Sequence, residues 1–152
     1  MLSSSAFQLI SSVLVFIVGL FILLGIRKYL WSNLKRASLL YIWHTVLCVV
    51  YFWYVLNKGG DATMYFTHAL LYGFEGEFSF GTAGIVYLTA FLVQILGLSF
   101  LGCFLVFNIF GSIGLIAFDS TLRYATRESS PYLKLLASMI VFLPSIAFGH
   151  LL

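Results

Sequence analysis

The chain has 152 residues, of which 62% are hydrophobic and only 9% are charged. Soluble domains carry about 25% charged residues, so this composition excludes an ordinary soluble protein and predicts an all-α integral membrane protein. The net charge of +3 does not indicate a nucleic-acid partner, because the basic residues stand beside the apolar runs, where they set membrane orientation. Both cysteines, Cys48 and Cys103, fall inside apolar runs, so neither a disulfide framework nor a Cys–His metal site is expected.

The first span is expected over residues 6–26. No positive charge precedes its apolar core and no A-x-A site follows it, which predicts a retained span and not a removed signal peptide. The next loop, RKYLWSNLKR, carries Arg27, Lys28, Lys35 and Arg36 and no acid. This positive charge predicts a cytoplasmic loop and an extracytoplasmic N-terminus in a bacterial cytoplasmic membrane. The four basic side chains are candidate contacts for lipid head groups.

The second span is expected over residues 37–57, and residues 58–80 then form an extracytoplasmic loop with a short helix. This loop gathers three of the chain's five acids, Asp61, Glu75 and Glu77, against a single lysine. A polar substrate that is met on the outer face would explain this concentration, since acidic residues contribute little to membrane topology.

Residues 81–118 are mostly apolar and could form one long span or two short ones. The loop that follows carries three basic residues, Arg123, Arg127 and Lys134. Two complete spans would place that loop outside, against the charge bias. We therefore expect a short re-entrant or interfacial helix over residues 81–95, a backbone break near Gly97, and a third span over residues 99–118.

The last span is expected from residue 133 to the end, with Pro144 kinking or ending it. The prediction is thus a single membrane domain over residues 1–152, with four transmembrane helices and one short re-entrant or interfacial helix.

In the third span, Asn108, Gly111 and Gly114 follow one another at a spacing of three, which predicts a helix-packing face. Asp119 stands at the end of that span and is a poor signal for an intramembrane transport site.

The loop residues Asp61, Tyr65, His68 and Tyr72 are spaced by four, three and four, so they share one stripe if a helix begins at Asp61. A carboxylate, an imidazole and two phenols could bind a sugar or act as a base toward a hydroxyl. The alternative is that Asp61 only caps the helix after two glycines, with His68 and the tyrosines at the membrane interface.

Glu75 and Glu77 flank Gly76 and could together bind a divalent cation. No third ligand accompanies them, so a solvated loop is the alternative. No other cofactor is expected.

Four stretches in order, GGDATMY, FGTAGIVYLTAFL, FNIFGSIGL and LPSIAF, resemble the N-terminal part of bacterial O-antigen and exopolysaccharide polymerase-like membrane proteins. More distantly they resemble the type C fold of glycosyltransferases. The resemblance covers about residues 35–148. It implies a substrate carried on a polyprenyl phosphate or diphosphate and a catalytic acid in the first extracytoplasmic loop, which Asp61 matches. Tyr65 matches the aromatic residue that follows the family acid by four positions. With this resemblance, the candidate sugar-binding residues are Tyr65, His68, Tyr72, Glu75 and Glu77.

Family members have more spans and continue past the Pro-Ser-aromatic motif, whereas this sequence stops at FGHLL. The resemblance therefore implies half of a larger site, which is inactive alone and completed by further helices or by another membrane subunit. A small non-catalytic helical subunit and a transporter fragment, suggested by the broken helix, are the two other interpretations.

Overall fold

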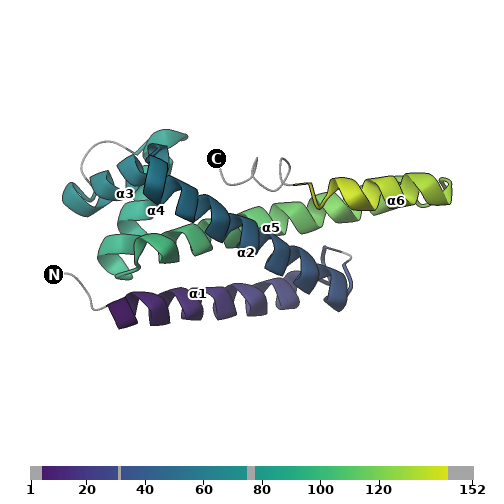
Figure 1. Ribbon diagram of the computed structural model, residues 1–152, viewed down its shortest axis with the longest axis horizontal. Helices are drawn as coiled ribbons and strands as arrows, with labels where there is room; N and C mark the ends of the chain where they lie inside the picture. Colours follow the sequence, from purple (N-terminus) through teal and green to yellow (C-terminus); the bar gives the residue numbers. More distant parts are fainter. Residues whose placement is uncertain (1–4, 31, 75–77, 144–152) are drawn as a thin grey trace. The chain divides into compact units, whose positions relative to one another are not determined.

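The computed structural model describes residues 5–30, 32–74 and 78–143, and within these ranges the regular structure is helical without a strand (Figure 1). The predicted all-α class is therefore confirmed. The elements are α1 Ser5–Ile26, α2 Leu34–Lys58, α3 Asp61–Leu71, α4 Thr82–Ala90, the π-helix η1 Phe91–Ile95, α5 Phe100–Ala125 and α6 Pro131–Ile140.

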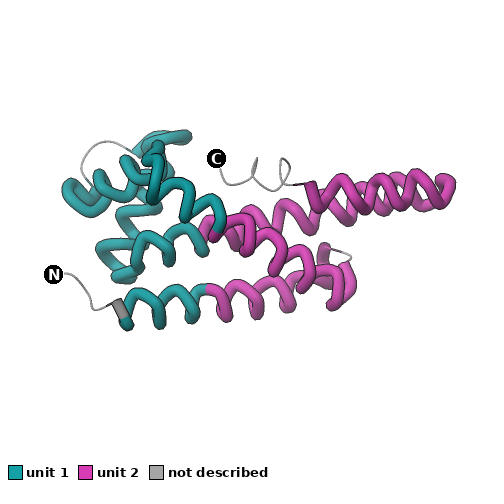
Figure 2. Tube along the Cα trace, in the orientation of Figure 1, with its two compact units in different colours: residues 1–15, 50–105 teal, residues 16–49, 106–152 magenta. Residues whose placement is uncertain are grey.

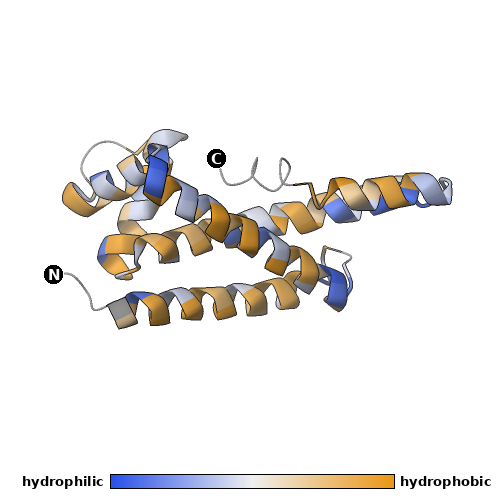
Figure 3. Cartoon of the chain, in the orientation of Figure 1, coloured by the Kyte–Doolittle hydropathy of each residue, from blue (hydrophilic) through white to orange (hydrophobic). Residues whose placement is uncertain are grey.

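Three helices, α1, α2 and α5, are long and apolar enough to cross a membrane. With 21 to 26 residues in each apolar stretch, they reach about 32–39 Å, which matches or exceeds a hydrocarbon core of about 30 Å. The orange of hydrophobic residues covers much of their ribbons (Figure 3). They correspond to the first three predicted spans, although α2 begins three residues earlier and α5 ends at Ala125 and not near residue 118.

The predicted fourth transmembrane helix is not confirmed. Helix α6 has 10 residues, or about 15 Å, which is half of the hydrocarbon thickness. It begins at Pro131 because Ser130 caps it, accepting from the backbone N–H of Leu133, and because proline is well suited to the first helical position. The predicted kink at Pro144 lies outside the described residues.

The predicted break near Gly97 is confirmed. Together α4 and η1 cover Thr82–Ile95, which at about 21 Å is too short to cross a membrane. Gly97 has a φ of +65°, which glycine adopts without strain, and α5 then begins at Phe100. The N–H of Leu98 donates to the carbonyl of Leu92 over 2.9 Å, so the break keeps backbone hydrogen bonding. The region is neither one unbroken helix nor two full antiparallel spans.

The chain divides into two compact units (Figure 2). Unit 1 comprises residues 1–15 and 50–105 and contains α3, α4 and η1, with α3 packed on α4. Its aromatic cluster joins the ends of α2 and α5 to α3 through four rings, those of Phe52, Phe66, Phe100 and Phe104.

Unit 2 comprises residues 16–49 and 106–152 and holds the main apolar core. The core side chains come from α1, α2, α5 and the residue after α6: Leu23, Ala37, Leu40, Tyr41, Leu115, Ile116 and Val141. Tyr41 stacks on Phe16 at 5.2 Å between ring centroids and donates its hydroxyl to the carbonyl of Phe16 over 2.9 Å. This bond satisfies the one polar atom that Tyr41 brings into the core.

The close approach of α1 to Tyr41 depends on Gly19. A Cβ at this position would lie 2.6 Å from Cγ1 of Ile109 and even closer to the Tyr41 hydroxyl. We expect Gly19→Ala to displace both side chains and to lower the free energy of unfolding by about 1–3 kcal/mol. The measurement is the thermal unfolding midpoint of purified protein in detergent.

Gly25→Ala is the matched control, because it lies in the same helix with open space around its Cα. It should leave the midpoint unchanged or raise it slightly, since alanine favours helix over glycine by up to about 1 kcal/mol. Equal midpoints for the two variants would contradict the packing described for Gly19.

Candidate functional site

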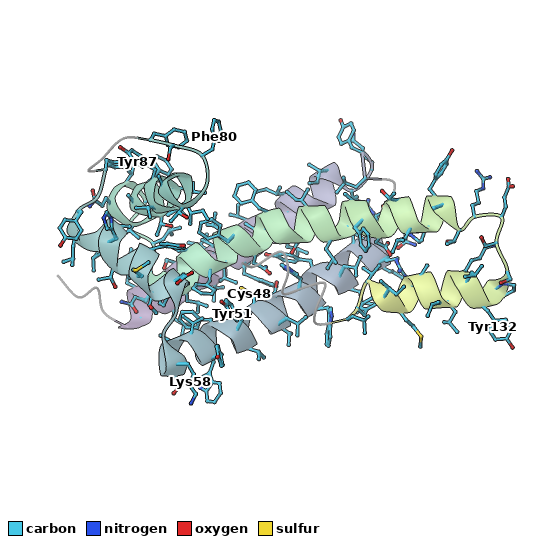
Figure 4. All side chains as sticks on the ribbon, turned by 90° about the horizontal axis from the view of Figure 1, so that it is seen from above. Cys48, Tyr51, Lys58, Phe80, Tyr87 and Tyr132 are labelled. Atoms are coloured by element: carbon cyan, nitrogen blue, oxygen red, sulfur yellow. The ribbon has the colours of Figure 1, made fainter. Side chains whose placement is uncertain are left out.

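Helix α3 follows α2 after only two residues. Helix α2 ends at Lys58 (Figure 4), and Gly59 and Gly60 take φ values of +75° and +143°. Such backbone conformations favour glycine strongly, which is the physical reason for the GG pair between the helices. The turn lets a new helix begin at Asp61, as the spacing of the stripe predicts.

Asp61 does not cap α3, so the interpretation of this residue as an N-cap is wrong. The N-cap position is Gly60, and no side chain caps the helix. Asp61 already occupies the first helical position, and the hydroxyl of Thr63 turns back to donate to the carbonyl of Gly60 over 2.6 Å. The exposed Asp61 carboxylate makes no capping hydrogen bond, and at the first helical position it lies near the positive end of the helix dipole.

The four residues of the predicted stripe keep their spacing in the structure. Asp61, His68 and Tyr72 are exposed and Tyr65 is half-buried. The rings of His68 and Tyr72 are in contact, with 4.9 Å between their centroids and 46° between their planes. The stripe thus combines a carboxylate, an imidazole and two phenols along one helix.

Another face of α3 is fixed to the rest of unit 1. Ala69 is fully buried, and its carbonyl accepts a hydrogen bond from Nε2 of Gln94 over 3.1 Å. Phe66 packs on Phe100 with 4.7 Å between ring centroids. Since Gln94 lies in η1, the π-helical turn orients the amide that holds α3. Irregular helical turns of this kind are frequent at functional sites.

The predicted ligands Glu75 and Glu77 lie outside the described residues, so their roles as sugar or cation ligands stay predictions. The chain on either side is aromatic. Tyr87 of α4 donates its hydroxyl to the carbonyl of Phe74 over 3.1 Å, and Phe80 is 96% exposed (Figure 4). Among the described residues, no group of three His, Cys, Asp or Glu side chains could hold a metal ion.

The predicted lipid-binding residues do not form a uniform set. Arg27 donates its Nε to the carbonyl of Leu24, Lys28 lies over the ring of Tyr29, and Lys35 is exposed. Arg36 differs from them, because its guanidinium is bound to a carboxylate of another helix.

That carboxylate is Asp119, whose side chain is only 1% exposed. Its Oδ2 accepts from Nε of Arg36 over 2.8 Å and its Oδ1 accepts from Nη2 of Arg36 over 2.5 Å. Nε of Arg123, one helical turn further along α5, lies 3.1 Å from Oδ2. Sequence reasoning dismissed Asp119 as the end of a span. The arginine four residues later was the available signal, because i,i+4 pairs face each other on a helix.

A second polar group of unit 2 lies midway along α2 and in α5. His44, Asn108 and Ser112 are fully buried. Nδ2 of Asn108 donates to Oγ1 of Thr45 over 2.8 Å, and the Thr45 hydroxyl in turn donates to the carbonyl of Tyr41 over 2.8 Å. The Thr45 oxygen is thus the acceptor toward Asn108, which directs Oδ1 of Asn108 at His44.

This chain of bonds assigns the proton on the His44 ring. Oδ1 of Asn108 lies 2.6 Å from Nδ1 of His44, and an amide oxygen only accepts. Nδ1 therefore carries a hydrogen and donates it to Asn108, while the Ser112 hydroxyl lies 3.2 Å from the same nitrogen. A histidine inside an apolar helix was the sequence signal for this group, since polar residues inside spans are expensive and usually paired.

The predicted packing face of Asn108, Gly111 and Gly114 is realised only in part. Asn108 does join α5 to α2 through hydrogen bonds, as polar residues do between membrane helices. Gly114, however, has open space where a Cβ would stand, so it brings no neighbouring helix close. Hydrogen bonding, and not the small size of Gly114, accounts for the contact.

No protein-family model matches the chain, and no curated protein or solved structure matches it significantly. The resemblance to polysaccharide polymerase-like proteins is therefore still a prediction that depends on the four short motifs. The geometry of α3 and the polar groups of unit 2 are independent of it.

We expect Asn108→Leu to lower the free energy of unfolding by about 1–3 kcal/mol, because it leaves the Nδ1–H of His44 without its near acceptor inside the core. Ser112→Ala removes the more distant partner and should cost about 1 kcal/mol or less. Thermal unfolding of both variants in detergent measures the difference. Equal destabilisation would contradict the hydrogen-bond assignment.

Proposed function

We propose that the chain is part of a membrane glycan polymerase or glycosyltransferase that acts on polyprenyl-linked sugars at the extracytoplasmic face. One observation carries this proposal: the Asp61 carboxylate is exposed at the start of α3 and is not used as a helix cap. An exposed carboxylate that makes no capping hydrogen bond, on a face with aromatic side chains, suits recognition of a polar substrate.

In this proposal Asp61 acts as the base toward a sugar hydroxyl or anchors that hydroxyl by a hydrogen bond. His68 and Tyr72, whose rings are in contact, offer flat apolar surfaces with polar edges, and Tyr65 adds a phenol from the same stripe. The bond between Gln94 and Ala69 fixes the helix that carries the stripe, so that bound sugar need not order the helix. Glu75 and Glu77 would complete the sugar contacts.

We place the N-terminus outside, with α1, α2 and α5 as full crossings. Helix α4 with η1 would enter the outer leaflet as a half-helix, because its 14 residues are apolar yet too short to span. A fourth crossing would begin with α6. The basic loop between α1 and α2 supports this orientation, since short positively charged loops stay in the cytoplasm.

A second candidate function is a non-catalytic helical membrane subunit or scaffold. The observation in its favour is that the polar groups between α2 and α5 of unit 2 bond to one another, as in a packing interface. In that case the exposed stripe on α3 would contact a partner protein and no sugar.

We expect Asp61→Asn to abolish glycan polymerisation in producing cells at matched membrane expression, because an amide cannot accept the hydroxyl proton. Loss of a general base lowers a rate by about 10²–10⁴-fold. The measurement is polymer length and yield, with Glu128→Gln as control, since Glu128 is an exposed acid of unit 2.

The fold should survive Asp61→Asn, because the change removes only a favourable helix-dipole contribution of about 0.3–1 kcal/mol. A melting midpoint that is within a few degrees of wild type checks this. If the Asp61→Asn variant makes polymer of wild-type length and yield, the catalytic role of Asp61 is contradicted and the scaffold function is favoured.

The topology gives a separate expectation. After the buried cysteines Cys48 and Cys103 are replaced, a membrane-impermeant thiol reagent should label Ser79→Cys in intact cells and should label Lys35→Cys only after permeabilisation. Labelling of Lys35→Cys in intact cells would reverse the proposed orientation.

A further inference from the structure

Unit 2 is strongly basic. It contains seven of the chain's eight lysines and arginines and two of its five acids, a net charge of +5. All seven basic residues lie in two connections, the one between α1 and α2 and the one between α5 and α6, or in the helix turns next to them. They are Arg27, Lys28, Lys35, Arg36, Arg123, Arg127 and Lys134. This end of unit 2 therefore attracts anions.

The two arginines at Asp119 stand apart from the other basic residues, because the fold orients them. A single carboxylate pairs with both guanidiniums, so the cluster of Arg36, Asp119 and Arg123 keeps a net positive charge. The side chains of Arg36 and Arg123 are 21% and 36% exposed. This excess positive charge is partly exposed, so an anion from outside the protein can reach it and balance it.

The loop between α1 and α2 contacts the turn of α5 that carries Asp119. Ser120, the residue after Asp119, donates its hydroxyl to the carbonyl of Leu30 and so holds the α1–α2 loop against this turn of α5. Two residues further along the loop, the Ser32 hydroxyl oxygen is inaccessible to solvent and has no hydrogen-bond partner among the described residues. A buried hydroxyl of this kind is usually matched by a ligand, an ion or water.

We propose that Arg36 and Arg123, oriented by Asp119, bind the phosphate group of an anionic phospholipid, with the Ser32 hydroxyl as a further donor. The inference does not depend on the proposed glycan activity. Guanidinium groups recognise phosphate through planar, paired N–H donors, and a carboxylate behind them fixes their orientation.

The position of the cluster favours a lipid over a soluble phosphate. Arg36 is the third residue of α2 and Asp119 lies within the last two turns of α5, so both stand where candidate spans end. Lipid head groups occupy that depth of a bilayer. Basic residues beside the ends of spans also attract anionic lipids without direct contacts, and the surrounding lysines and arginines would add a diffuse attraction of this kind.

The test uses the full chain purified in a zwitterionic detergent. Phosphatidylglycerol, phosphatidylcholine and inorganic phosphate are titrated separately, with binding followed by native mass spectrometry and by the thermal unfolding midpoint. We expect phosphatidylglycerol to bind at least about tenfold more tightly than phosphatidylcholine. Inorganic phosphate at the same concentrations should not raise the midpoint.

Arg123→Gln should weaken phosphatidylglycerol binding by about tenfold, since it removes a charge-assisted donor pair. Arg127→Gln is the matched control, because it removes the same charge one turn later from an exposed side chain and should change binding less than about twofold. If Arg123→Gln does not fold, Arg123→Lys keeps the charge and should lose binding by about threefold, because lysine lacks the planar fork.

Two results would overturn the proposal. Equal loss of binding in Arg123→Gln and Arg127→Gln would mean diffuse attraction to the basic surface. Equal stabilisation by inorganic phosphate and phosphatidylglycerol would mean a site for free phosphate and not for a lipid.

Discussion

A carboxylate inside an apolar helix bundle must be paired, and in unit 2 the pairing of Asp119 with Arg36 determines how α2 and α5 run together. His44 lies eight residues after Arg36 in α2, and Ser112 lies seven residues before Asp119 in α5. At 1.5 Å per residue these steps are about 12 Å and about 10 Å, so the two polar contacts satisfy the same antiparallel register. A shift by one helical turn would therefore remove the partner of Asp119 and the Ser112 partner of His44 together.

In unit 1 the main constraint is backbone hydrogen bonding, because its short elements must change direction without leaving backbone groups unsatisfied. Gly59 and Gly60 turn the chain between helices, and η1 with Gly97 ends the half-length helix while the N–H of Leu98 still finds an acceptor. The same π-helical turn supplies Gln94, which holds α3 by a side-chain hydrogen bond. An exposed carboxylate is thus presented on a helix that is fixed through another of its faces.

The net charges of the two units are opposite in sign, so the two units suit different kinds of ligand. Unit 1 carries three acids and one lysine, whereas unit 2 carries seven basic residues and two acids. A neutral, hydroxyl-rich ligand suits the acid and aromatic rings of α3. A phosphate suits the guanidiniums at Asp119. The ligand class that we propose for each surface therefore follows from its own side chains.

The sequence by itself determined the elements whose signal is local. Apolar length predicts α1, α2 and α5, the GG pair and the spacing after Asp61 predict α3, and the charge bias after residue 118 predicts the break at Gly97. The limit of α5 was missed, because Asp119 and Arg123 look like the polar end of a span until their pairing lets the helix continue to Ala125.

Tertiary structure alone decided which polar residues have partners. The Asp119–Arg36 pair joins residues 83 positions apart, and the His44–Asn108 bond joins residues 64 apart, so neither is visible in local periodicity. For Asp61 the sequence leaves two roles open, because an aspartate at this position suits a helix cap as well as a contact with a ligand. Only the backbone conformation of Gly60, which takes the cap position itself, leaves the Asp61 carboxylate available for a ligand.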